Sequence, residues 1–437
     1  MWLKTLLVRI KRKYIIHGFL YVSSWLITTS ARKSRFFASW AISIPITLLI
    51  LSIRPFVKVR MIHLPSPRIG HFALNVEYVL CKVTQKFDKN NARILTYYYT
   101  SHSICNKQLY KMWKRIIPII PFPFIMEQID ILLSAFLGKK YINDHIKQMM
   151  VSDFSGVDLY NLIYTTQPHL TFTKKEKIIG ENLLKEFGVP SGASFVCILV
   201  RDQEYLNRQY PDIDWSYHDC RDADIDNYQK VALYLAEKGI FVFRMGKYMK
   251  KRFIVNHPNV IDYAHHSKRS DFMDIYLSAN CSFFISTGSW IDAVAQIFRK
   301  PILCSNYAEF FICPWVCAWH MLVPKKLRTK DGEYLNMSQI IKIISHNKNH
   351  NKLLSRILED ESLEFVENTP EELLNAVIEM CNLLEQRLIL TNMQNIKQAI
   401  FWEKCRVACN AYGKELPQNI SVFISPDFFE KNAYFLC

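Results

Sequence analysis

Four small residues between a short apolar segment and an amphipathic one form a pattern that could bind an anion. Residues 281–286 (CSFFIS) predict a buried strand and residues 290–298 a helix, with Ser286, Thr287, Gly288 and Ser289 turning the chain between them. Such a turn presents backbone N–H groups and the positive end of a helix dipole. It suits a nucleotide diphosphate in an open α/β sheet, although an ordinary serine-capped turn is the simpler interpretation.

Two arginines end the predicted strands that precede this turn. Arg201 follows residues 195–200 (FVCILV), and Arg244 lies in residues 240–246 (IFVFRMG). A guanidinium forms paired hydrogen bonds with a diphosphate and keeps its charge. The alternative for Arg201 is an ion pair with a neighbouring carboxylate, while Gly246 could let a ligand approach the backbone.

Acidic triplets could hold Mg²⁺ or Mn²⁺ on a nucleotide. Asp222, Asp224 and Asp226 form two overlapping D-x-D triplets, and Asp212 and Asp214 form a third. The first group lies where the predicted helix 225–239 begins. Carboxylates at that point cap free N–H groups, and we favour capping over metal binding.

A general base is less easily chosen. His71 follows Arg68 and Gly70 in a loop at the end of the predicted strand 57–64, so it could take a proton from a hydroxyl. A single loop histidine is more often structural. The other base candidates are Asp202, His218 and Asp219.

Strands and helices alternate as in a doubly wound parallel sheet. A first unit has strands at 57–64 and 92–99 around a helix at 72–87, and a second begins near residue 174. Its last predicted strand is 301–306, and the chain from residue 338 is mostly helical. Residues 369–372 (TPEE) are typical of a helix start. We therefore expect an α/β protein with two Rossmann-like domains facing a cleft.

Positive charge is concentrated at the N-terminus. No Asp or Glu precedes Glu77, and residues 1–76 hold a basic excess within a net charge of +16. A nucleic-acid-binding domain would instead carry its charge on a folded face. Residues 14–31 and 36–53 are free of formal charge and flanked by Lys and Arg, which predicts helices lying on an anionic bilayer. Spanning helices, or helices packed on the protein's own core, are the alternatives.

Several enzyme classes are excluded because their sequence motifs are missing. There is no G-x-G-x-x-G after a strand, no P-loop and no G-x-S-x-G. The 12 cysteines are scattered without a zinc-site pattern, which indicates free thiols and a reducing compartment.

Several separated blocks resemble a family of bacterial glycosyltransferases found in surface-polysaccharide loci. They are CILVRD, RDADIDNYQKVALYLAEKGIFVFRMG and SDFMDIYLSANCSFFISTGSWIDAVAQIFRKPI, with RIGH, FVENTPEELL and ISPDFFEKN in the same order. More distantly, the Arg201 strand and the Ser/Thr turn look similar to the donor domain of fucosyltransferases. The chain departs from the family at Trp290, where a small residue is usual, and at Ala295, where Pro is usual.

The resemblance covers about residues 57–437 and implies a two-domain glycosyltransferase B fold. Together with the basic, apolar N-terminus it leads us to expect four segments: a membrane-associated segment (1–56), an acceptor domain (57–172), a nucleotide-sugar domain (173–345) and a helical region packing back on the N-terminal domain (346–437). The implied reaction moves a sugar from a nucleotide sugar to a hydroxyl of a glycan or lipid-linked glycan, without a metal or another cofactor. The alternative is a non-catalytic sugar-binding or scaffold protein with a dead donor site.

The residue patterns and the resemblance together assign roles to the candidate residues. We expect a cytoplasmic protein on the inner membrane surface, with no nucleic-acid partner. The expected catalytic residues are His71 and Asp202, and the expected acceptor-binding residues are Arg68 and Gly70. The expected donor-binding residues are Arg201, Arg244, Gly246, Asp271, Ser286, Thr287, Gly288, Ser289 and Asp292.

Overall fold

The computed structural model describes residues 39–85, 94–149, 158–289, 291–310, 320–346, 362–411 and 415–437. They divide into two compact units, which are described separately here. The first draws on residues up to Leu64, Asn90–Ser103 and Ile117–Lys147, and the second on the remainder. The four segment boundaries expected from the sequence stay a prediction.

The first unit holds a small parallel sheet. Its strands are β1 (Lys58–Leu64), β2 (Ile94–Thr100) and β3 (Ile119–Ile120), in that order. Residues 39–53 form a helix, and α4 (Pro123–Met149) bends at Gly138, where φ is 61°. Apolar side chains of β1, β2 and α4 build its core: Met61, Tyr99, Met126, Ile129 and Leu133. Both long predicted strands of this region are therefore confirmed.

No helix in the described ranges combines the length and the apolar character of a membrane-crossing segment. The predicted helix 14–31 and the start of the segment 36–53 lie outside the described residues.

The second unit is built on a seven-stranded sheet in the order β12-β9-β8-β7-β4-β5-β6, with every neighbouring pair parallel. Its central strands β4 (Phe195–Leu199), β5 (Phe241–Arg244) and β7 (Phe284–Ser286) are buried throughout, as strands covered on both faces must be. The outer strands are β6 (Val260–Ile261), β8 (Ile302–Tyr307), β9 (Met321–Pro324) and β12 (Phe423–Ile424). The predicted α/β class with parallel sheets is confirmed.

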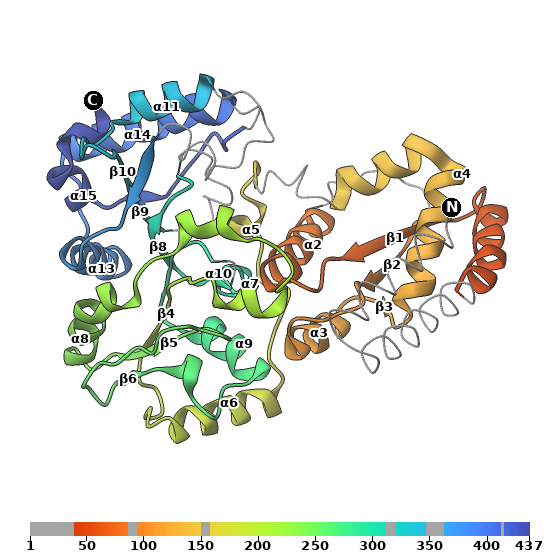
Figure 1. Cartoon of the computed structure of the whole chain (residues 1–437). Coiled ribbons are helices and arrows are strands. Elements are labelled where there is room, and N and C mark those ends of the chain that lie inside the picture. The colour runs from red at the N-terminus through yellow and green to blue at the C-terminus, as the bar shows by residue number, and fades with distance from the viewer. Residues whose placement is uncertain are drawn as a thin grey trace, which may run out of the picture. The chain divides into compact units, whose positions relative to one another are not determined.

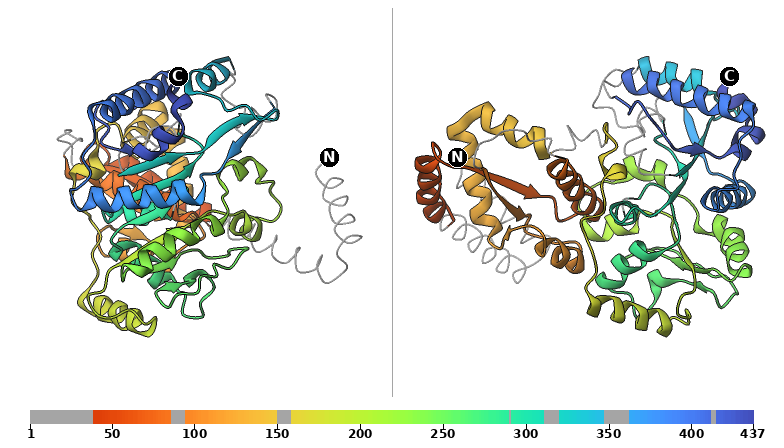
Figure 2. Two further views of the ribbon diagram at one scale, coloured as in Figure 1. Left: turned by 90° about the vertical axis from the view of Figure 1, so that its left-hand side faces the viewer. Right: turned by 180° about the vertical axis from the view of Figure 1, so that it is seen from behind.

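Helices cover both faces of this sheet (Figure 1). One layer contains α8 (Gln229–Glu237) and α13 (Pro370–Leu384), which pack together, and the other contains α9 (Asp271–Asn280) and α10 (Asp292–Ile297). The same two layers are seen from behind in Figure 2. The remaining helices of this unit's C-terminal part are α5 (Leu162–Thr165), α6 (Lys174–Glu186), α7 (Glu204–Gln209), α11 (Met337–His346), α14 (Asn392–Ala411), α15 (Pro426–Lys431), and the short η3 (Ser216–Arg221), η4 (Ile225–Tyr228), η5 (Tyr263–His265) and η7 (Ala433–Leu436).

One expectation about the C-terminal part differs from the structure. The strand at 301–306 is not the last, because β9 and β12 extend the sheet, and β10 (Lys326–Thr329) pairs antiparallel with β11 (Leu363–Val366). Helices α13, α14 and α15 contribute apolar side chains to the core of the seven-stranded sheet, and the expected packing of this region on the N-terminal domain stays a prediction. Phe401, Trp402 and Phe428 are buried there.

Three N-terminal helices belong to the second unit. They are the π-helical turn η1 (His71–Asn75), α2 (Val76–Thr84) and α3 (Lys107–Lys114). η1 packs against α10 and α3 packs against α9. Trp113 is fully buried and its indole N–H donates to the carbonyl of Phe72 at 2.9 Å. The loop with Arg68 and His71 is thereby held at the helix that follows β7.

Candidate functional site at the strand ends of the second unit

The strand order of the second unit creates a place for a ligand. The chain runs from β4 outward through β5 to β6, then returns to β7 on the other side of β4 and continues outward through β8 to β9. The connections after β4 and β7 therefore leave in opposite directions, and in open α/β sheets ligands bind outside the carboxyl ends of strands at such a reversal. Arg201 and Thr287 follow these two strands, and the Arg201 N–H donates to Thr287 Oγ1 at 3.0 Å.

The turn after β7 is largely satisfied by its own side chains. Ser286 Oγ donates to Asp292 Oδ2 at 2.9 Å and accepts the N–H of Gly288 at 3.1 Å. The Gly288 N–H, which we expected to face a diphosphate, is thus already engaged. Ser289 Oγ is buried and has no hydrogen-bond partner among the described residues, and Trp290 lies outside those residues.

Gly288 is required by its surroundings as well as by its conformation. Its φ is +75°, a region that favours glycine, and a Cβ atom built there would lie 2.9 Å from the ring of Tyr307. The close approach of the turn to Tyr307 fixes the position of the four residues. The positive φ and the closeness of Tyr307 together explain why glycine occupies position 288.

Arg201 is the predicted residue whose setting best fits anion binding. Its side chain is 10% exposed, and Nη1 forms an ion pair with Asp222 and donates to the carbonyl of His218 at 3.0 Å. Its other terminal nitrogen, Nη2, is buried without a partner among the described residues. Burial and the charge of Arg221 lower the pKa of Arg201 to about 10, so the guanidinium is charged near neutral pH. An unpaired buried N–H group is costly, and an anion would satisfy it.

Further cations surround the short helix η3, and the sequence analysis missed two of them. Arg221 forms a 3.3 Å ion pair with Glu309, and Lys325 donates to the carbonyl of Cys220 at 3.1 Å. Lys325 is almost fully buried, and burial lowers its pKa. We call Arg68, Arg201, Arg221 and Lys325 the basic cluster. Arg221 ends the short helix η3 and Lys325 follows strand β9, and neither of these elements was predicted.

The loop before η1 reaches the basic cluster. The guanidinium of Arg68 lies 5.4 Å from the ring centroid of Trp215, and the imidazole of His218 stacks on that same indole. Burial, then Arg221, Arg201 and Arg68, lower the pKa of His218 to about 3. The structure therefore brings Arg68 and Arg201 together around one histidine, although 133 residues separate them in the chain.

His71 and Gly70 lie at the start of η1. Gly70 precedes its first residue with an ordinary helical φ of −60°, so no special backbone demand explains the glycine. Burial and then the charge of Arg68 lower the pKa of His71. An imidazole that stays neutral near pH 7 can accept a proton, as a general base must.

The other predicted residues have structural partners. Both carboxylate oxygens of Asp202 accept backbone N–H groups, from Glu204 and Lys250. Asp271 accepts the N–H of Lys107 at 2.8 Å and so ties α9 to α3. Asp219, a further base candidate, has a pKa raised by burial.

Arg244 is buried at the end of β5. It donates to the carbonyl of Lys251 at 3.0 Å and lies 3.4 Å from Asp262, and burial lowers its pKa. Its Nε has no partner among the described residues and Arg244 lines a cavity of about 420 Å³. Gly246 lies close to Met249. A Cβ atom built on Gly246 would lie only 2.5 Å from the Met249 side chain.

The acidic triplet has the capping role that we favoured at one position. Asp224 caps η4 by accepting the N–H of Asp226 at 3.0 Å, and Lys251 lies 2.9 Å from the same carboxylate. Asp222 pairs with Arg201. Asp226 also forms an ion pair with Lys251, so all three carboxylates serve helix capping or charge pairing.

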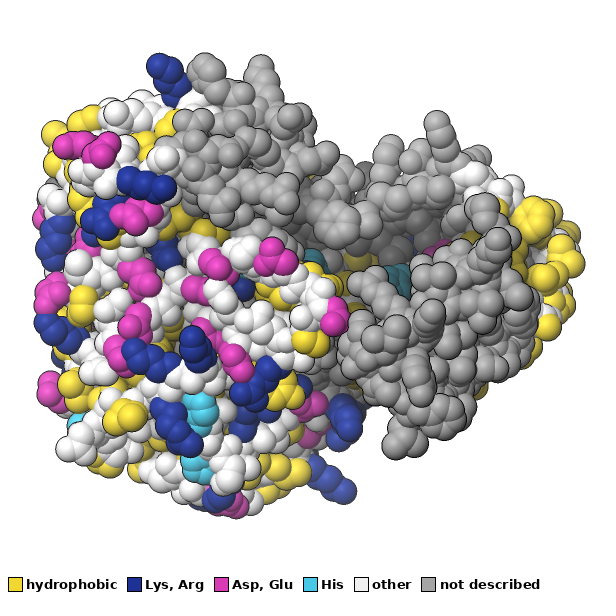
Figure 3. Space-filling model, in the orientation of Figure 1, with side chains coloured by type: hydrophobic (Ala, Val, Ile, Leu, Met, Phe, Trp, Pro, Cys, Tyr) yellow, Lys and Arg dark blue, Asp and Glu magenta, His cyan; other side chains and the backbone are white. Residues whose placement is uncertain are grey.

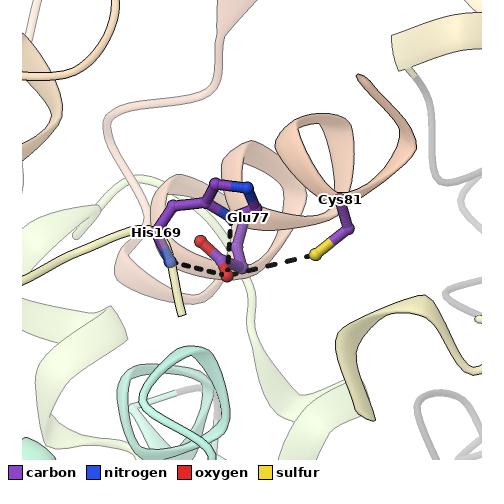
Figure 4. Close-up of side chains that lie close together, drawn as sticks. All are labelled: Glu77, Cys81 and His169. Atoms are coloured by element: carbon purple, nitrogen blue, oxygen red, sulfur yellow. Dashed lines mark hydrogen bonds and ion pairs between the residues drawn. The ribbon is translucent and has the colours of Figure 1, made fainter. Parts of the chain in front are cut away.

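One group of side chains in the second unit has the residue types of a metal site. Glu77, Cys81 and His169 converge within 4.8 Å, and Figure 4 shows the Glu77 carboxylate at their centre. Arg299 Nη2 lies 2.7 Å from Glu77 Oε1 and contacts Cys81 Sγ at 3.6 Å. Burial, followed by the charge of Glu77, raises the pKa of Cys81 to about 12, so the thiol keeps its proton. A guanidinium already neutralises this carboxylate, so we interpret the group as an ion-pair clamp.

Comparisons with known proteins give weak likenesses. No family model matches the chain. The search of curated proteins finds no match. Three similar solved structures are ADP-heptose lps heptosyltransferase II of E. coli (11% identity, covering 75% of this chain and 99% of that one, TM-score 0.41), a glycosyl transferase family 9 protein of Veillonella parvula (11%, 75%, 97%, 0.41) and the E. coli heptosyltransferase WaaC with ADP (12%, 66%, 97%, 0.29).

All three similar structures are glycosyltransferases by their descriptions. None is a fucosyltransferase, so the distant similarity to that class gains no support. At these TM-scores the likenesses carry no argument about the chain. Its α/β architecture and candidate site rest on its own strand order and side chains.

Proposed function

We propose that this protein is a glycosyltransferase that uses a nucleoside-diphosphate sugar as donor. The carrying observation is Arg201, which follows β4 at the reversal of strand order and keeps a buried Nη2 without a partner among the described residues. An anion with several oxygens would satisfy that nitrogen and the buried hydroxyl of Ser289. The resemblance of these segments to polysaccharide-locus glycosyltransferases supports the choice of a nucleotide sugar over other anions.

The proposed chemistry assigns one step to each group. His71 accepts the proton of the acceptor hydroxyl, whose oxygen attacks the anomeric carbon while the bond from that carbon to the diphosphate breaks. Arg201 stabilises the charge that develops on the departing diphosphate. We propose that no metal is needed, because Asp222 and Asp224 serve pairing and capping. The proposed acceptor is a glycan hydroxyl, on a lipid-linked intermediate.

Thermal melting of the full chain tests the donor site. Wild type, Arg201→Gln and Arg387→Gln are melted with ADP, GDP, UDP or CDP, with EDTA or with Mn²⁺. Arg387 is the matched control, because its side chain is 65% exposed and paired with Glu385. A ligand at about 100 times its Kd stabilises the native state by about 2.7 kcal/mol.

We expect one nucleotide to raise the melting temperature of wild type and of the control, with EDTA present, but not that of Arg201→Gln. If no nucleotide shifts wild type, the scaffold alternative gains and the transferase proposal fails. An unchanged shift in Arg201→Gln would remove Arg201 from the site. A shift that needs Mn²⁺ would contradict the metal-independent step.

A further inference from the structure

The helix at residues 39–53 has its polar and apolar sides reversed relative to a water-soluble helix. Its buried stripe consists of small hydroxyl residues four positions apart: Ser39, Ser43 and Thr47. Ser43 is completely buried and donates to the carbonyl of Ile125 in α4 at 3.1 Å. Thr47 Oγ1 donates back to the carbonyl of Ser43 at 2.8 Å. Residues this small let two helices approach closely, which is how helices pack inside membranes.

The opposite side of the same helix is apolar and exposed. Leu49 is 62% exposed, and Phe56 just beyond the helix is 78% exposed. In Figure 3 apolar side chains gather at the right-hand edge, over this helix. We call this surface the apolar face of helix 39–53; its members are Ile42, Ile44, Ile46, Leu48, Leu49 and Ile53.

The charge around the apolar face restricts what can cover it. Arg54, Lys58 and Arg60 follow the helix in the chain, and no Asp or Glu precedes Glu77. The acidic Glu127 and Asp130 belong to α4, which accepts the hydrogen bond of Ser43. Exposed apolar faces mark interaction sites, and the cations that follow the helix are complementary to an anionic partner. A bilayer with anionic headgroups offers hydrocarbon to the isoleucines and leucines and negative charge to the flanking arginines.

We infer that the apolar face of helix 39–53 docks the protein on an anionic lipid bilayer. The proposal does not depend on the nucleotide site, which lies in the other unit. It differs from a general attraction of the basic N-terminus, because it assigns binding to particular exposed side chains. It also accounts for the hydroxyl stripe, which leaves the larger apolar residues of the helix facing outward.

Vesicle flotation with the full chain tests the inference. The probes are vesicles of phosphatidylcholine alone and with about one-third phosphatidylglycerol. Ile46→Glu/Leu49→Glu changes two neighbours on the apolar face. Ile178→Glu/Ile254→Glu is the matched control, because these isoleucines are 57% and 76% exposed in the second unit. Melting temperature checks that each variant folds.

Wild type and the control should float with the anionic vesicles, and Ile46→Glu/Leu49→Glu should bind them at least tenfold more weakly with an unchanged melting temperature. If that variant floats like wild type, another segment carries the protein and the inference fails. The inference also fails if wild type floats with neither kind of vesicle. It fails as well if the variant loses self-association but not vesicle binding, since a second copy of the chain then covers the apolar face. Nucleotide shifts measured on the same samples report on the donor site independently.

Discussion

Ser286 Oγ donates to Asp292 Oδ2 across the turn that follows β7, over 2.9 Å. The same oxygen accepts the N–H of Gly288, so one buried hydroxyl closes the turn from inside. Ser289, three positions on, has a buried hydroxyl without a partner among the described residues. Two serines of one turn are therefore expected to differ in what they contribute.

Replacing each serine by alanine tests this difference. Ser286→Ala should lower the free energy of unfolding by about 2 kcal/mol, because the Gly288 N–H and Asp292 Oδ2 both lose their hydrogen bond to this hydroxyl. Ser289→Ala should change it by less than about 0.5 kcal/mol without ligand, since no hydrogen bond is lost. Urea denaturation of both variants measures the effect. Equal losses would show that Ser289 is also bonded in the free protein.

Gly288→Ala should be more damaging than an alanine at another glycine with the same backbone. Gly192 has φ of +80° and open space around its Cβ position, whereas a Cβ at Gly288 would meet Tyr307 at 2.9 Å. A left-handed alanine costs about 1 kcal/mol by itself. We expect Gly288→Ala to lose at least about 1 kcal/mol more than Gly192→Ala in urea denaturation. Matching losses would mean that Tyr307 moves aside without cost.

Glu77→Gln tests the ion-pair clamp against a metal site. Glu77 is fully buried, and removing its charge leaves Arg299 unpaired, which should cost about 3 kcal/mol. Glu385→Gln, in an exposed pair with Arg387, should cost less than about 0.5 kcal/mol. Neither Zn²⁺ nor EDTA should move the melting temperature of wild type. A rise with Zn²⁺ that vanishes in Glu77→Gln would identify a metal centre instead.

Glu379 should make stability depend on pH. Burial raises its pKa to about 7, against hydrogen bonds from Ser425 and the Asp427 N–H that lower it. A raised carboxyl pKa means that the folded state binds the proton more tightly. Its stabilising effect is full below pH 4.5 and is lost as the pH rises to about 7, by up to about 3 kcal/mol.

Glu379→Gln removes this titration and keeps an acceptor for the Asp427 N–H. The variant should therefore be more stable than wild type at pH 8 and similar at pH 5, in urea denaturation at each pH. Glu181→Gln, at an exposed position of α6, serves as the control and should follow wild type. A wild-type difference between the two pH values that survives in Glu379→Gln would assign it to another group.

Local signals predicted many elements well. Helix α9 has a clear local signal, because Ser270 caps it and its apolar residues recur at helical spacing. The helix start expected at 369–372 is confirmed, and Thr369 and Glu372 form a capping box there. The central strands β4, β5 and β7 were identified because they are short apolar runs with a polar residue at or just after their ends.

The parts that the sequence could not show depend on distant partners. Strand β12 has two residues, and its pairing with β9 joins segments about a hundred positions apart. Lys325 joins the basic cluster only because β9 ends there, and Arg221 does so only because η3 is helical. The occupied N–H of Gly288 also escaped prediction, since the rotamer of Ser286 decides it.

The bond between Glu77 and Arg299 spans 222 residues of sequence. A ribosome adding roughly 5–20 residues per second needs on the order of 10–40 seconds between these two side chains. During that interval Glu77 of α2 has been synthesised, but Arg299, which neutralises its carboxylate, has not. Helix α2 should therefore reach its final packing only after the chain around Arg299 has been made. Fragments that end before Arg299 should express poorly and should bind chaperones.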